Sequence, residues 1–384
     1  MISLSLRAGI VVVCGLLGSC AGDTGPRSDP RDVIELRWVH AYPGESRSDV
    51  ETGVLWGLSL LGAKLPEHTD VIVWHDDRLT VDLARAHMVE GAQPAWRALL
   101  AAMKASGEYR ARGALDIGRF LSLTLGSAPH YYALTGAIDD YATARAKYRF
   151  DAQSAAIVTS AVALGSRRID LSVANRAEDL AFVAYEGKGS LADGSFAPHE
   201  MELLDMMPNG QLRFALYDLD GHLKAGASPE LTKAGKPGKC MWCHESGLQP
   251  TFVDFPRAAG YYDRHEFDAL VTERRSLLNA YRDGLDTQLR FHHAQDHTFV
   301  ELLYASFQEP SRERLAAEWG VPLERVAEQV RGKPTHAQTE YPKLGAALYR
   351  REDVEALAPY AVLAAPRDVR EASADDPDYL GARR

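Results

Sequence analysis

Five consecutive residues in the middle of the chain, Cys-Met-Trp-Cys-His at 240–244, carry reactive side chains at a spacing that suits cofactor chemistry. On a helical turn, thiols three residues apart lie on neighbouring faces, and the histidine lies one turn after the first thiol. Thiols can form thioethers, a disulfide or metal bonds, and a neutral imidazole is a common metal ligand. Which chemistry applies depends on the compartment of the protein and on its other cysteines.

The amino terminus has the pattern of a targeting segment. Arg7 supplies a positive charge, residues 8–17 form an apolar stretch too short to span a bilayer, and Leu-Gly-Ser-Cys follows. This pattern resembles a bacterial lipoprotein signal, which implies a signal peptide over residues 1–19 and a lipid on Cys20. We therefore expect an exported protein, anchored by its lipid in the periplasm at the outer membrane. An ordinary signal peptide with an incidental cysteine is the alternative.

The export prediction leaves few cysteines in the folded protein. Cys14 departs with the signal peptide and Cys20 carries the lipid, so Cys240 and Cys243 are the two that remain. Cys-x-x-Cys-His is the attachment signature of c-type haem, because two thiols at this spacing reach both vinyl groups of the porphyrin and the histidine reaches the iron. The segment resembles the c-type cytochromes. The resemblance implies one covalent haem c, with thioethers from Cys240 and Cys243 and with His244 as the proximal iron ligand.

The resemblance also implies a function, namely one-electron transfer between periplasmic redox proteins, so we expect an electron carrier rather than a catalyst. The single Cys-x-x-Cys-His excludes a dihaem peroxidase and a multihaem wire. A haem c enzyme or gas sensor with an open distal site is the first alternative. In a haem-free scaffold lipoprotein, Cys240 and Cys243 would instead form a disulfide. A thioredoxin-like dithiol and a zinc site are further alternatives.

The sixth iron ligand is not evident from the sequence. Small soluble cytochromes c supply a methionine downstream of the motif, whereas Met241 is the last methionine of this chain. The downstream histidines considered as distal or metal ligands are His265, His293 and His297. His292 precedes His293, and His336 is expected to be isolated in a loop. Upstream methionines at 201, 206 and 207, or no protein ligand, are the other choices. Pro250 is expected to place a carbonyl oxygen near the imidazole of His244.

The composition is that of a globular protein, with 46% hydrophobic and 25% charged residues. The formal charge of -10 argues against nucleic-acid binding, which requires a basic face. Apolar periodicity and turn residues predict an α+β fold that is mainly helical, with a small β-hairpin region before a helical haem-binding half. The expected organisation is a tether at 20–32, a mainly helical domain at 33–152, a haem domain at 153–366 and a mobile tail at 367–384.

Individual elements follow from local signals. Strands are expected at 33–39 and 71–74, and a hairpin at 201–221 is predicted by its Asn209-Gly210 turn. A helix at 48–62 is expected to begin with a capping box formed by Ser48 and Glu51. Further helices are predicted at 94–107, 115–126, 138–148, 263–285, 297–307, 312–320 and 323–332.

Overall fold

The computed structural model describes residues 28–157, 159–249, 252–254, 258–293, 295–371 and 376–381. The predicted signal peptide, the lipid-bearing Cys20, most of the tether and Pro250 lie outside these residues. Within the described ranges, no helix combines the length and the apolar character needed to span a bilayer.

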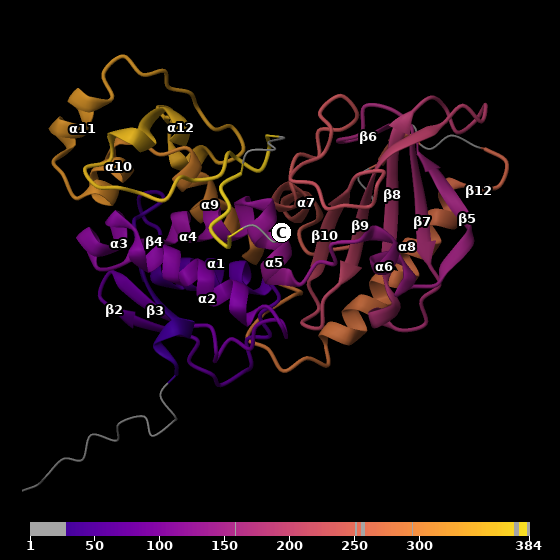
Figure 1. Cartoon of the computed structure of the whole chain (residues 1–384), viewed down its shortest axis with the longest axis horizontal. Coiled ribbons are helices and arrows are strands. Elements are labelled where there is room, and N and C mark those ends of the chain that lie inside the picture. Colours follow the sequence, from indigo (N-terminus) through magenta and orange to yellow (C-terminus); the bar gives the residue numbers. More distant parts are fainter. Residues whose placement is uncertain are drawn as a thin grey trace, which may run out of the picture.

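Two lobes make up the described part of the chain (Figure 1). The first contains a four-stranded sheet of order β2-β3-β1-β4, in which β1 and β4 are parallel and the other pairs are antiparallel. Its strands are β1 (Val33–Arg37), β2 (Ile72–His75), β3 (Arg78–Asp82) and β4 (Leu115–Asp116). Its helices from the amino-terminal half are α1 (Arg47–Leu60), α2 (Gln93–Ala105), α3 (Gly107–Arg112), α4 (Ile117–Leu121), a π-helical turn (Ser122–Gly126) and α5 (Ala128–Thr135).

The carboxyl-terminal helices join this first lobe rather than the second. They are α9 (Asp296–Gln308), α10 (Arg312–Trp319), α11 (Leu323–Gln329) and α12 (Arg351–Val354). Helix α9 packs directly on α1, and a Cβ at Gly53 would lie 2.8 Å from Leu303 Cδ1 and 3.0 Å from the backbone of Phe299. Glycine thus permits the close approach of the two helices. These helices were expected in the second domain, so the division at 152/153 does not describe how the chain packs.

The second lobe is a six-stranded sheet of order β10-β9-β8-β7-β5-β12, antiparallel except for the β5–β12 pair (Figure 1). The predicted hairpin is present as β9–β10, with Met206 opposite Leu212. The sheet is larger than the small hairpin region expected. Its strands are β5 (Phe150–Ile157), β7 (Arg167–Ser172), β8 (Ala181–Lys188), β9 (Ala197–Met206), β10 (Leu212–Tyr217) and β12 (Tyr261–Tyr262), and a separate pair is β6 (Thr159–Ser160) with β11 (Phe252–Asp254).

The helices of the second lobe are α6 (Tyr141–Ala146), α7 (Pro237–His244) and α8 (Arg264–Arg282). Helix α8 begins with a capping box of Asp263 and Glu266. The capping box of α1 is formed by Ser46 and Asp49, not by Ser48 and Glu51, because the helix starts at Arg47. The mixture of helices and sheets confirms the predicted α+β class.

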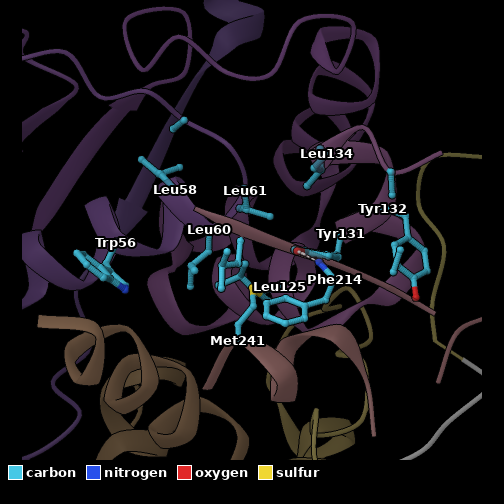
Figure 2. Close-up of a cluster of buried hydrophobic side chains, with 14 of the residues drawn as sticks. Trp56, Leu58, Leu60, Leu61, Leu125, Tyr131, Tyr132, Leu134, Phe214 and Met241 are labelled. Carbon is cyan, nitrogen blue, oxygen red and sulfur yellow. Dashed lines mark hydrogen bonds between the residues drawn. The ribbon is translucent and has the colours of Figure 1, made fainter. Parts of the chain in front are cut away.

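One hydrophobic core runs through both lobes and includes α7. Figure 2 shows Met241 of α7 and Phe214 of β10 beside Leu60, Leu61 and Leu125 of the first lobe. A hydrogen bond from the backbone N–H of Phe214 to the hydroxyl of Tyr131, 3.2 Å long, also crosses between the lobes (Figure 2). The helix that carries the cysteines is therefore fixed against the body of the protein.

The carboxyl-terminal segment, expected to be mobile, packs against the body in its described residues. Val369 is fully buried beside Gly238 of α7. Asp376 forms a buried ion pair with Lys236, the residue that precedes α7. The Tyr379 N–H donates a 2.9 Å hydrogen bond to Nε2 of His130. Low apolar content predicted mobility, whereas the described residues of the segment make specific polar contacts with the body.

Candidate functional site

Helix α7 places the residues of the motif. Pro237 occupies its first turn, where its fixed φ suits a helix and its missing N–H is not needed. The helix ends at Glu245 in the left-handed conformation, with φ of 48°. Cys240 and His244 are one helical turn apart and share a face, whereas Met241 points into the core and is 2% exposed.

Cys240 and His244 line a cavity between the six-stranded sheet, α7 and α8. The cavity encloses about 780 Å³ of empty space, including its open mouth. Side chains from α8 and from the segment after α7 complete the wall, and they are Leu248, Gln249, Phe267 and Val271. Cys243 is exposed and does not line the cavity, although it follows Cys240 by one helical turn.

On the cavity face of the sheet, the side chains form rows that run across the strands. Every second residue of a strand points to the same face, and the pairing of the strands aligns these residues. One row is apolar throughout: Leu171, Phe182, Leu204 and Phe214. The next row contains a single charged residue, and its members are Ile169, Ala184, Glu202 and Leu216. The third row is ionic, with Arg167, Glu186 and Glu200. The cavity therefore changes from apolar to charged along the strands.

The imidazole of His244 lies at the apolar side of the cavity, with its ring centroid 5.4 Å from that of Phe214. Burial lowers the pKa of His244 to about 4, so the ring is neutral at physiological pH. Its Nδ1 atom is buried and makes no hydrogen bond of ordinary geometry among the described residues, although the backbone of Gly247 lies close enough to raise the pKa of the ring. A buried polar atom without a partner costs free energy, about 1–3 kcal/mol. This imidazole is in the protonation state that binds a metal.

Both cysteines are free thiols in the structure. Burial raises the pKa of the Cys240 thiol, and the negative charge of Glu202 raises it further. A dithiol redox centre requires a thiolate with a lowered pKa. The electrostatics of this site thus do not favour the thioredoxin-like alternative.

The histidines considered as distal ligands lie elsewhere. His265 is exposed on the first turn of α8, and His293 is exposed and pairs with Asp296 at 2.6 Å. His297 lies 3.6 Å from a carboxylate oxygen of Glu245 in a separate hollow of about 1000 Å³. None of the three lines the cavity. Among the described residues, no three histidine, cysteine or acidic side chains are grouped so that they could hold a metal ion.

The upstream methionines do not line the cavity either. Met201 and Met207 are buried in the core, and Met206 is buried on the cavity face of β9, two rows beyond Glu202. Sequence reasoning missed Glu202 and Arg167, which do line it. The available signal was a glutamate within the apolar run Met-Glu-Leu-Leu of a predicted strand.

In comparisons with known proteins, no family model, curated protein or solved structure matches this chain.

Proposed function

We propose that this protein carries one covalent haem c in the cavity, and that its iron keeps an open site for a small molecule. The observation that carries the proposal is the buried, neutral imidazole of His244, which lacks a partner at Nδ1 and lines the cavity together with Cys240. Cys240 and Cys243 would hold the porphyrin as thioethers, Cys243 from the exposed rim. His244 would be the proximal ligand.

The chemistry of the lining suits the faces of a porphyrin, because the apolar row and the side chains of α8 are hydrophobic. The enclosed space is smaller than that of ordinary ligand pockets, so the ring enters only if the walls of the cavity move apart. When bound, haem supplies a redox-active iron whose behaviour depends on axial ligands and burial. The apolar row would keep water from the ring, and Phe214 would pack beside the imidazole of His244.

We favour an iron with an open distal site over an electron-transfer iron with two protein ligands, because the described lining of the cavity offers no second ligand. Among the described residues of its lining, Cys240 and His244 are accompanied by no further histidine, cysteine, methionine or lysine. A haem c enzyme or gas sensor is therefore our first proposal. Electron transfer is the second, favoured by the exposure of Cys243, which would leave one edge of the ring near the surface. Attachment of haem c outside the cytoplasm agrees with the proposed lipid anchor at Cys20 in the periplasm.

The test is expression of the exported chain together with the haem-attachment machinery. Covalent haem staining should survive denaturation in the wild type and disappear in the C240A/C243A double variant. The reduced protein should be high-spin and bind carbon monoxide at once, and a His265→Ala variant should match it. A low-spin iron that ignores carbon monoxide would support the electron carrier, and a colourless protein would refute both.

A further inference from the structure

A second hollow, on the first lobe, is lined by an excess of positive charge, and we call it the basic hollow. It lies between the end of β1, the end of α3 and one side of α10, and α3 and α10 are on the same side of the lobe (Figure 1). It offers about 800 Å³ of space, within the range of ligand pockets, about 300–1,000 Å³. Five of its lining residues are cations: Arg37, Arg112, Arg312, Arg314 and Lys343. The chain as a whole has a formal charge of -10, so this local excess opposes the overall charge.

Arg37 is the unusual member of this lining, because its charge is buried without a counter-charge. It is 4% exposed, and its two Nη atoms donate to the backbone carbonyl oxygens of Ala317 and Glu318, at 3.1 and 2.9 Å. Its Nε is buried without a hydrogen-bond partner, and it forms no ion pair with a carboxylate of the described residues. Helix carbonyls carry only partial negative charge. Since a charged side chain is rarely buried unless it is paired, Arg37 has positive charge to offer a ligand.

Three more cations of the basic hollow are also without a carboxylate partner in the part of the chain that the structure describes. Arg112 is half-buried, and its buried Nε has no hydrogen-bond partner there. Arg312 and Lys343 are exposed at the rim. Arg314 differs, since two buried carboxylates lie 2.9 Å from its guanidinium. The positive charge of the hollow therefore comes from groups that the protein itself leaves unneutralised.

The remaining wall of the basic hollow is largely apolar. Its apolar and aromatic members are Trp38, Val39, Ala41, Tyr42, Leu344 and Ala347. The indole N–H of Trp38 already donates to Glu45 at 2.7 Å, so its ring contributes apolar surface rather than a free donor. Two exposed carboxylates, Asp77 and Glu313, complete the charged part of the lining.

We propose that the basic hollow binds an organic anion with an apolar body, such as an aromatic carboxylate. Its carboxylate would accept hydrogen bonds from Arg37 and Arg112, while its ring would lie against the apolar wall. Hydrogen bonds between a guanidinium and a carboxylate are among the strongest in proteins. Arg312 and Lys343 would attract the anion from the rim. No residue of the Cys-x-x-Cys-His motif lines this hollow, so the inference does not depend on haem.

The test is isothermal titration calorimetry of the mature exported chain with 2-naphthoate, and with the neutral 2-naphthalenemethanol for comparison. Naphthoate should bind at one site, and added salt should weaken its binding because salt screens the attraction between charges. The alcohol should bind about 10-fold more weakly or not at all, since it lacks the charge.

Two variants and a matched control test the residues. Arg37→Gln should weaken naphthoate binding, but Arg37 also binds the carboxyl end of α10, so a second variant changes exposed residues alone. Arg312→Gln with Lys343→Gln should weaken binding by about 5-fold. The control, Arg264→Gln with Lys188→Gln, removes the same charge from exposed positions of the second lobe and should bind naphthoate as the wild type does.

The outcomes separate this proposal from the haem assignment, because calorimetry detects naphthoate binding whether or not the chain carries haem. Absence of naphthoate binding at millimolar concentration would overturn the anion site, and so would equal affinities for naphthoate and the alcohol. Equal losses in the rim variant and the control would mean that overall charge, and not the basic hollow, determines binding. Binding of a glutamate-rich peptide without binding of naphthoate would also overturn the proposal, in favour of an acidic protein segment.

Discussion

Replacing Asp376 with asparagine should destabilise the protein strongly, because it would leave a buried ammonium without a counter-charge. Lys236 and Asp376 have side chains that are 0% and 1% exposed. Lys236 Nζ donates otherwise to carbonyl oxygens, including that of Arg367 at 2.9 Å. Removing one partner of a buried ion pair costs about 3–5 kcal/mol. The free energy of unfolding, from urea titration followed by circular dichroism, should fall by about this amount.

The matched control removes both charges. Lys236→Met with Asp376→Leu should be much less damaging than Asp376→Asn alone, because two apolar side chains leave no uncompensated charge. A loss below about 1 kcal/mol in D376N, the size of an exposed ion pair, would refute the reasoning. So would a double variant as unstable as the single one. In that case the contact of the carboxyl-terminal segment with α7 would not depend on this pair.

Three further predictions concern the rest of the structure. Burial raises the pKa of Glu301 from 4.5 to about 7, so its protonated form stabilises the fold and this contribution is lost as the pH rises through that range. Relative to Glu301→Gln, the wild type should lose roughly 3 kcal/mol of unfolding free energy between these pH values, measured by urea titration at each pH. Asn209→Ala removes two 2.8 Å hydrogen bonds to the carbonyls of Ser59 and Ala63 and should cost about 1–3 kcal/mol by the same assay; an unchanged midpoint would contradict this. None of the candidate distal histidines lines the cavity, so replacing any one of them with alanine should leave the visible spectrum of the holoprotein unchanged; the three are His265, His293 and His297. A change in the spectrum of one variant would show that the replaced histidine is an iron ligand.

Local signals were sufficient to predict many elements of the fold. The Asn209-Gly210 turn predicted the β9–β10 hairpin, since Gly210 adopts a positive φ of 81°. Apolar spacing predicted α8, whose buried residues include Phe267, Val271 and Leu278. These elements depend on residues close together in the sequence.

The candidate site depends on contacts that the sequence does not display. Glu202 lies in a cavity row with Ile169 and Leu216 only because strand register aligns four strands. The burial that lowers the pKa of His244 likewise comes from Phe214 and its neighbours on the sheet. The motif indicated a chemistry, whereas tertiary packing determined which side chains face the same space.

The most direct test is the visible spectrum and intact mass of the mature exported protein, oxidised and reduced. We predict a coloured protein with one porphyrin retained after denaturation through Cys240 and Cys243, and a reduced spectrum that changes when carbon monoxide is added. A colourless protein whose mass shows only a lipid would contradict it.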